Sequence, residues 1–181
     1  MKRKLLVFLM AFFLIIILLT QFGIDIGGVR IGKQMDLKTH QDKNFEKSNF
    51  YKEYYSKDKL TVLNLWATWC VACVEEMPDL NSIKAKYKND SFNFISLSVD
   101  NDSIKLIKFF NKDKFSFKDV TLINLKYRNA ILNTLEGEKT DKWISSQSVP
   151  KTYLIKNNKV VAKIDGAIER QELIGLIEKY K

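Results

Sequence analysis

The hydrophobic residues of this chain fall into three successive patterns. Residues 5–19 form an unbroken apolar run, whereas residues 25–57 show little apolar periodicity at first and contain glycines that interrupt regular elements. From residue 58 to the end, short apolar stretches alternate with stretches of helical spacing. This alternation predicts one α/β domain over residues 58–181, in which helices cover both faces of a central sheet.

The elements of this domain follow from the hydrophobic period and from the turn residues. Strands are predicted at residues 60–66, 92–99, 120–123, 151–155 and 159–164. Helices are predicted at residues 71–87, 102–110, 126–135 and 169–180. Asn157 and Asn158 separate the last two strands, and asparagine tolerates the positive φ of a tight turn, so these strands should form an antiparallel hairpin. The aromatic-rich stretch 45–55 predicts a short helix packed on the domain.

The N-terminal apolar run has the features of a targeting segment. Three cations, Lys2, Arg3 and Lys4, precede it, and residues 20–24 extend it to nearly the length that a bilayer requires. We expect residues 1–24 to form a signal-anchor transmembrane helix with its N-terminus in the cytoplasm, and residues 25–57 to be a membrane-proximal connection. The domain then lies outside the cytoplasm, on the periplasmic side, in a single-pass protein of the cell membrane. A cleaved signal peptide is the competing interpretation, although no Ala-x-Ala pattern follows the run.

The formal net charge of +9 does not point to nucleic acid. The lysines are scattered among acids and aromatics, and no basic block or recognition motif is present. We therefore expect no nucleic-acid partner. The single histidine, His40, lies outside the predicted domain and is expected to be solvated.

The chemistry of the chain centres on its only two cysteines, Cys70 and Cys73, which form one Cys-x-x-Cys motif between a predicted strand and a predicted helix. The first turn of a helix presents unpaired N–H groups and the positive end of the helix dipole, which stabilise a thiolate. Cys70 is expected to be the attacking thiol, and Cys73, one turn further on, the resolving thiol. A zinc site needs about four ligands, which the chain does not supply here, and a disulfide closing so short a loop would stabilise little. We expect no metal and no cofactor apart from this redox-active pair.

The residues around the motif resemble a known family. The segment Asn64–Cys73 (NLWATWCVAC) and the following Glu75–Pro78 (EEMP) resemble the active-site segment of the thioredoxin superfamily, and in detail its TlpA/ResA branch. The resemblance covers roughly residues 58–181 and is densest at residues 62–80. It implies a thioredoxin-like fold, with a central mixed β-sheet flanked by helices, and an exported, often membrane-anchored thiol–disulfide oxidoreductase.

The resemblance also implies roles for residues that would contact a substrate. Pro150 corresponds to a cis-proline that faces the two cysteines in the family, and the backbone of Val149 would pair with an extended substrate polypeptide. An ordinary turn is the alternative for Pro150. Trp69 is expected to form an apolar rim for docking, whereas Trp66 is expected in the core. Pro78 falls inside the active-site helix, where the family carries a kink.

Three further positions carry weaker implications. Glu76 lies three residues after Cys73, and the resemblance suggests that it relays protons between the thiols and solvent; the alternative is an exposed helix acid. Asn64 stands where thioredoxins themselves have a buried aspartate, and it cannot take up a proton, which leaves proton handling to Glu76. Gly166 resembles a family glycine at which backbones pack closely, with a plain turn glycine as the alternative.

The expected function is reduction of disulfides in exported client proteins, with a membrane electron donor re-reducing Cys70 and Cys73. Cytochrome c maturation is one setting that the resemblance allows. The dipeptide between the cysteines contains no histidine, which favours a reducing role over the alternative of a disulfide oxidant or isomerase. A non-catalytic binding or metal-delivery factor on the same fold is a third alternative. Residues 112–148 are expected to be an insertion that either shapes a partner surface or covers the sheet.

Overall fold

The computed structural model describes residues 10, 24–26, 29–31, 42–87, 92–111, 116–141 and 147–181. The chain divides into two compact units, Met1–Asp36 and Leu37–Lys181. The sequence pattern placed the start of the domain at residue 58. The second unit starts earlier than that, because aromatic side chains of residues 45–55 are buried in its core.

In the first unit, two three-residue strands, β1 (Ile24–Ile26) and β2 (Val29–Ile31), pair antiparallel. Two glycines separate these strands in the sequence, so the strands end where the glycines were expected to interrupt regular elements. Within the described residues, no helix is both long and apolar enough to cross a membrane. The run at residues 5–19, predicted to be transmembrane, lies outside them except for Met10.

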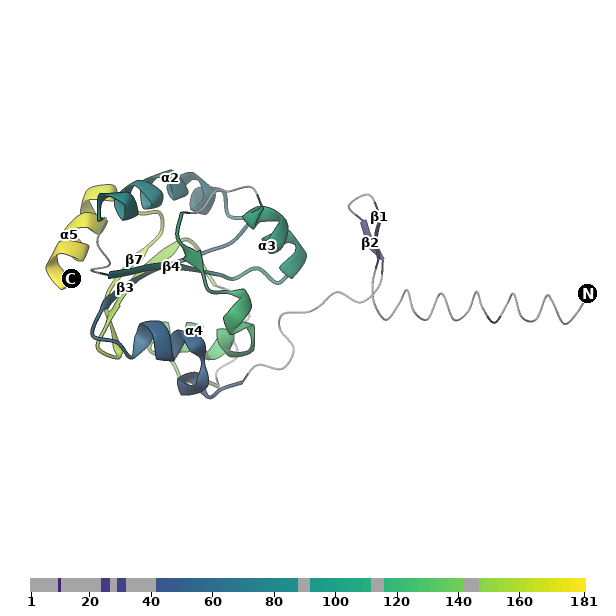
Figure 1. The fold of residues 1–181 in the computed structure, drawn as a ribbon, viewed down its shortest axis with the longest axis horizontal. Helices are drawn as coiled ribbons and strands as arrows, with labels where there is room; N and C mark the ends of the chain where they lie inside the picture. The colour runs from purple at the N-terminus through teal and green to yellow at the C-terminus, as the bar shows by residue number, and fades with distance from the viewer. Residues whose placement is uncertain are drawn as a thin grey trace, which may run out of the picture. The chain divides into compact units, whose positions relative to one another are not determined.

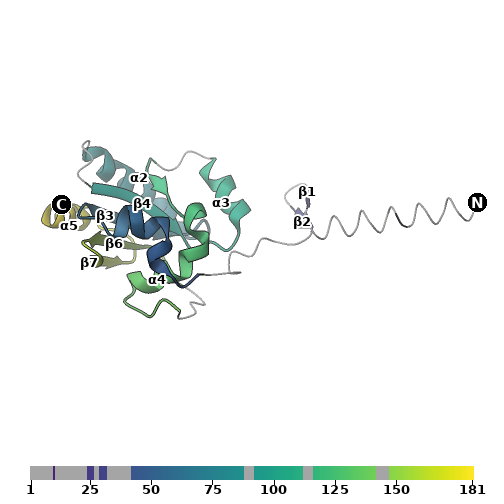
Figure 2. The ribbon, with the colours of Figure 1, turned by 60° about the horizontal axis from the view of Figure 1, so that its bottom comes forward.

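The second unit is built on a five-stranded mixed sheet in the order β5-β4-β3-β6-β7. Parallel pairing joins β3 (Leu60–Trp66) to β4 (Phe92–Ser98), whereas β6 (Lys151–Lys156) and β7 (Lys159–Asp165) continue the sheet antiparallel. Figure 2 shows these four strands side by side. The turn between β6 and β7 has φ values of 52° and 62° at its two asparagines, which confirms the predicted hairpin.

The edge strand β5 (Lys118–Asp119) differs from its prediction at residues 120–123. It pairs with β4 over only two residues, and the Asp119 carboxylate then accepts the backbone N–H of Thr121 at 2.9 Å. This side-chain bond offers the backbone an alternative to the ladder, so the chain leaves the sheet. A 3₁₀ helix, η3 (Leu122–Tyr127), follows, and α4 (Arg128–Leu135) therefore starts two residues later than predicted.

Helices cover both faces of the sheet, as the alternating pattern predicted (Figure 1). One face packs against α2 (Val71–Lys86) and α5 (Arg170–Tyr180), through a cluster that includes Leu80, Ile83, Leu173 and Ile177. The shorter α3 (Ser103–Phe110) packs beside the start of α2.

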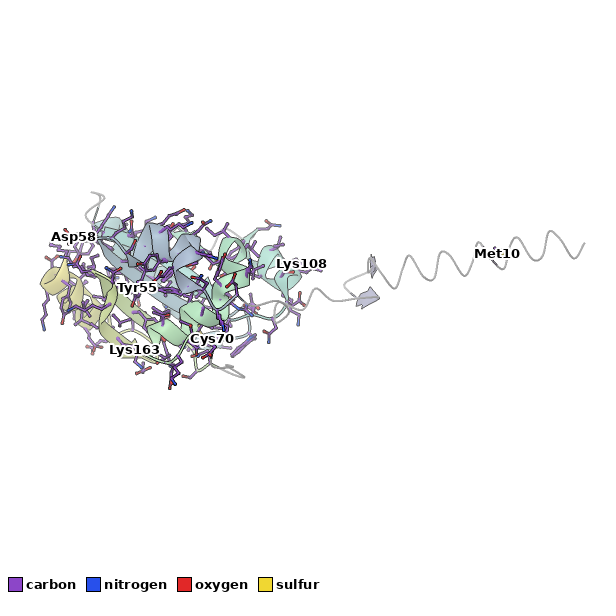
Figure 3. The ribbon with its side chains drawn as sticks, turned by 90° about the horizontal axis from the view of Figure 1, so that it is seen from below. Met10, Tyr55, Asp58, Cys70, Lys108 and Lys163 are labelled. Carbon is purple, nitrogen blue, oxygen red and sulfur yellow. A yellow bond between two sulfur atoms is a disulfide. The ribbon has the colours of Figure 1, made fainter. Side chains whose placement is uncertain are left out.

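The opposite face packs against α4, the 3₁₀ turn η1 (Phe45–Lys47) and the π-helical turn η2 (Tyr51–Tyr55). Phe45, Phe50 and Tyr55 contribute buried rings to this core, and Figure 3, drawn from that side, shows Tyr55 over the sheet. The predicted packing of residues 45–55 on the domain is confirmed, although the segment forms two short turns in place of one helix.

The central strand β3 leads directly into the candidate site. It is buried on both faces along its whole length. Leu63 and Leu65 point into the α4 side of the core, whereas Asn64 and Trp66 point toward α2. The strand ends at Trp66, so the residues that follow it emerge at the edge of the sheet where α2 begins.

Candidate active site

The two cysteines lie at the start of α2, as the sequence predicted, and are joined in a disulfide. Cys70 is the N-cap of the helix, and its Sγ accepts the backbone N–H of Cys73 at 3.2 Å. Cys70 is 8% exposed and Cys73 is fully buried. Cys70 is therefore the more exposed of the two cysteines, which fits the predicted order of attack and resolution.

The N-terminus of α2 suits a thiolate at Cys70. The helix has 16 residues and carries no acidic side chain in its first turn. The aligned peptide dipoles and the N–H group that points at the sulfur both favour negative charge there.

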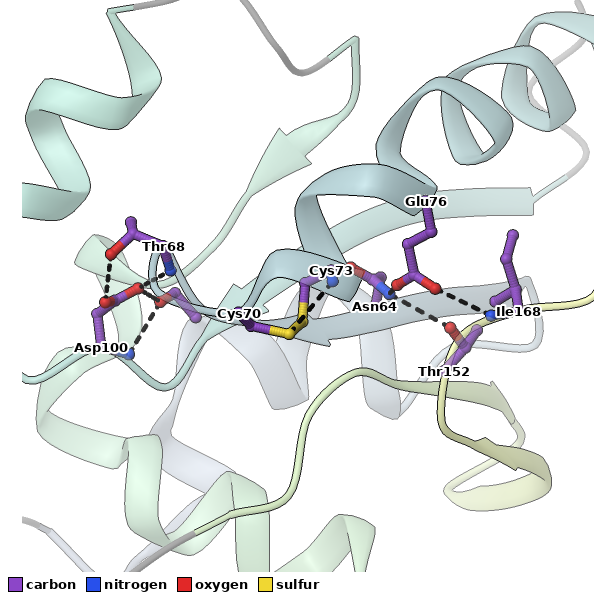
Figure 4. The surroundings of a disulfide bond; sticks show 9 residues. Asn64, Thr68, Cys70, Cys73, Glu76, Asp100, Thr152 and Ile168 are labelled. Carbon is purple, nitrogen blue, oxygen red and sulfur yellow. Dashed lines mark hydrogen bonds between the residues drawn. A yellow bond between two sulfur atoms is a disulfide. The ribbon is translucent and has the colours of Figure 1, made fainter.

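Glu76 is buried one turn beyond Cys73, on the same side of α2 (Figure 4). Its Oε1 accepts the Asn64 side-chain N–H at 2.8 Å, and its Oε2 accepts the Ile168 backbone N–H at 2.9 Å. Burial raises the pKa of Glu76 above its usual value, and the two hydrogen bonds offset only part of that effect. A carboxyl group that takes up a proton more readily beside Cys73 suits proton relay better than the role of an exposed helix acid.

Asn64 and Thr152 complete the surroundings of this carboxyl group. The Asn64 amide also lies 3.4 Å from the Thr152 hydroxyl oxygen, and both residues are fully buried. Sequence reasoning did not identify Thr152. It lies two residues after Pro150, at the start of a predicted strand, and this position would have indicated that it faces the surroundings of Glu76.

The Val149–Pro150 peptide bond is cis, as the resemblance implied. Val149 is partly buried against the cluster that contains Cys70 and Cys73, and the Pro150 carbonyl accepts the Gly166 N–H at 3.0 Å. Gly166 has a φ of +96°, and a Cβ atom there would meet nothing within 4 Å. The close backbone packing expected at Gly166 was therefore wrong, and the residue serves a turn that favours glycine.

An apolar surface borders the disulfide. Trp69 is 63% exposed and Val71 is 70% exposed, on either side of Cys70 in the sequence. Trp66 is buried as predicted, and its indole N–H donates to Asp119 Oδ2 at 3.0 Å. The two tryptophans of this segment thus divide into one at the surface and one in the core.

Asp100 and Thr68 were missed by sequence reasoning. Asp100 is buried just after β4, and its carboxylate accepts two hydrogen bonds from Thr68 in the turn before Cys70. The signal that could have found it is its position, because polar residues after neighbouring parallel strands meet at one edge of a sheet. Within the described ranges, no three His, Cys, Asp or Glu residues are grouped to hold a metal ion.

Comparison with known proteins places the chain in a family. The model of the Redoxin family matches residues 38–172. The chain belongs to the Redoxin family. Among curated relatives, it is 35% identical over 127 residues to a thiol-disulfide oxidoreductase ResA of Bacillus cereus. That alignment covers 68% of this chain and 64% of the relative, so the chain spans less than two thirds of that protein's length.

Solved structures support the fold of this Redoxin-family chain. The thiol:disulfide interchange protein DsbE from Chlorobium tepidum has a TM-score of 0.54 at 22% identity, over 69% of this chain and 82% of its own. StoA from Bacillus subtilis has a TM-score of 0.50 at 16% identity, over 67% and 84% of the two chains. These identities are low and show a shared thioredoxin-like fold alone. The similarity to ResA supports the resemblance to the TlpA/ResA branch.

Proposed function

We propose that this protein is a thiol–disulfide oxidoreductase that reduces disulfide bonds in exported client proteins. The observation that carries the proposal is the asymmetry of the cysteine pair. Cys70 is the more exposed cysteine and lies at the N-cap of α2, whereas Cys73 is fully buried, one turn before a carboxyl group whose pKa burial raises.

The reaction would proceed by two exchanges at sulfur. The Cys70 thiolate attacks one sulfur of the client disulfide, forms a mixed disulfide and releases one client thiolate. Cys73 then loses its proton and attacks Cys70 Sγ, which closes the Cys70–Cys73 disulfide and releases the second client thiolate. Two electrons pass to the client, and Glu76 accepts the Cys73 proton and passes it toward solvent.

The surface around Cys70 suits an extended polypeptide. Trp69 and Val71 offer apolar contacts for residues beside the client cysteine, and Val149, before the cis-proline, offers backbone groups for strand-like pairing. The similarity to ResA supports thiol–disulfide exchange. The absence of histidine between the two cysteines supports the reducing direction, with the oxidant or isomerase as the alternative.

The location and partners follow from the N-terminal sequence and from the family. The apolar run at residues 5–19, preceded by three cations, supports a membrane anchor with the catalytic unit outside the cytoplasm. A membrane electron donor would return the pair to the dithiol. Disulfides of apocytochrome c are one client class that the resemblance allows.

Two serine variants of the full chain test this proposal with a disulfide-bonded model client such as insulin. The wild-type protein should accelerate reduction of the client by dithiothreitol, and Cys70→Ser should abolish the acceleration. Cys73→Ser should accumulate a mixed disulfide through Cys70, because nothing remains to resolve it. A Cys70→Ser variant that keeps full activity would refute the proposal and support a non-catalytic role.

A further inference from the structure

A carboxylate from the end of β4 holds the turn that carries Cys70. Residues 67–70 connect β3 to α2, and the Cys70 N–H donates to the Ala67 carbonyl oxygen at 3.1 Å. Thr68, inside this turn, donates its backbone N–H to Asp100 Oδ2 at 2.8 Å and its hydroxyl to Asp100 Oδ1 at 2.7 Å (Figure 4). One residue of the turn thus engages both oxygens of the carboxylate.

Asp100 is itself held firmly in place. It is 2% exposed, and a buried carboxylate requires hydrogen-bond donors to offset its lost hydration. The Ser98 hydroxyl donates to Oδ2 at 2.6 Å, and the Asp100 N–H donates back to Ser98 Oγ at 2.9 Å. These two bonds tie Asp100 to Ser98, the last residue of β4.

Asp100 is also contacted by a residue of the segment 112–148, whose role the sequence left open. Arg128, at the start of α4, donates from Nη1 to the Asp100 carbonyl oxygen at 2.5 Å and is 7% exposed. Arg128, within the predicted insertion at residues 112–148, thus contacts the residue that holds the active-site turn, and α4, which it begins, also covers the sheet.

We propose that Asp100 is a positioning residue for thiol exchange, which acts through Thr68 to keep Cys70 at the N-cap of α2. This inference rests on the proposed function. The Cys70 sulfur meets the Cys73 N–H at 3.2 Å because the turn places it at the helix end. A turn released from Asp100 lets the sulfur leave the cap, which weakens the stabilisation of the thiolate and slows its attack.

The experiment replaces one hydrogen-bond donor in the full chain. Thr68→Val keeps the shape of the side chain but removes the hydroxyl, and Thr68→Ser restores it. The readout is the pH dependence of Cys70 alkylation by iodoacetamide in the reduced protein, with mass spectrometry to separate Cys70 from the buried Cys73. Asp102→Asn is the matched control, because the Asp102 carboxylate accepts the Ile104 and Lys105 N–H groups and so caps a different helix, α3.

Thr68→Val should raise the pH midpoint of alkylation and slow client reduction by about threefold or more, since a hydrogen bond to a charged group is lost. Thr68→Ser and Asp102→Asn should keep the wild-type midpoint. A Thr68→Val midpoint equal to that of wild type, or an equal shift in Asp102→Asn, would overturn the proposal even if the variants are less stable. Alkylation needs no client, so a wild-type protein that fails to reduce insulin would refute the proposed function separately.

Discussion

Replacing Glu136 with glutamine would remove the carboxylate at the centre of an ionic cluster at the end of α4. Lys151 Nζ lies 2.5 Å from Glu136 Oε1, and Lys163 Nζ lies 3.2 Å from Oε2. The Tyr153 hydroxyl also donates to Oε1, at 2.6 Å. The cluster joins α4 to β6 and β7 directly after the cis-proline, so its contribution to stability tests the packing of this side of the domain.

The size of the effect follows from the pKa of Glu136. Burial alone would raise this pKa, but the hydrogen bonds from Lys151, Tyr153 and Lys163 outweigh burial and lower it from 4.5 to about 2. A shift of this size corresponds to about 3 kcal/mol of stability. This is an upper limit, because the Glu136 side chain is 20% exposed and solvent screens the interaction.

The sign of the pH dependence is set by the direction of this shift. Because the folded pKa lies below the unfolded one, the stabilisation is complete above the unfolded value and is lost as the pH falls through the folded value near 2. Glu136→Gln should therefore be less stable than wild type by about 2–3 kcal/mol near neutral pH, and the gap should close as the pH falls toward about 2.

Urea unfolding of both proteins across this pH range measures the gap. Glu172→Gln, at an exposed position in the first turn of α5, changes the net charge equally and serves as the control. A gap that stays constant from neutral to acidic pH would refute the reasoning, because it would show that the carboxylate charge at Glu136 contributes nothing.

Three further substitutions test other parts of the structure. Phe50→Ala should lower the free energy of unfolding by about 3–5 kcal/mol in urea titrations, because a fully buried ring is lost; little change would exclude residues 45–55 from the folded core. Trp69→Ala should change that free energy by less than about 0.5 kcal/mol but raise KM for a disulfide peptide with apolar flanks; an unchanged KM would remove Trp69 from the docking surface. Glu76→Gln should gain stability relative to wild type as the pH rises from acidic to alkaline, because a buried acid with a raised pKa destabilises the fold when it ionises; a gain that falls with pH would contradict the assigned shift of the Glu76 pKa.

The local parts of the site could be predicted from the sequence, since they depend on neighbouring residues. Cys70 and Cys73 lie at a strand-to-helix junction that the hydrophobic period reveals, and the Asn157–Asn158 turn follows from backbone preference. The cis geometry at Pro150 came from the family resemblance and not from any local pattern.

The long-range contacts were not predicted, because they depend on which strands become neighbours. Asp100 reaches Thr68 only when β3 and β4 pair in parallel, and Glu136 meets Lys151 only when α4 packs across β6. The edge strand was misplaced for a related reason, since β5 is limited by side-chain bonds to Asp119 and not by its own hydrophobicity.

The reduction potential of the Cys70–Cys73 pair tests the proposed reductase most directly. The full chain would be equilibrated in dithiothreitol redox buffers, and its free thiols would be alkylated and counted by mass spectrometry. A potential near or below that of thioredoxin, about −270 mV, is the predicted result. A potential near that of the strong oxidants, about −120 mV, would contradict the reducing role and assign the protein to disulfide formation.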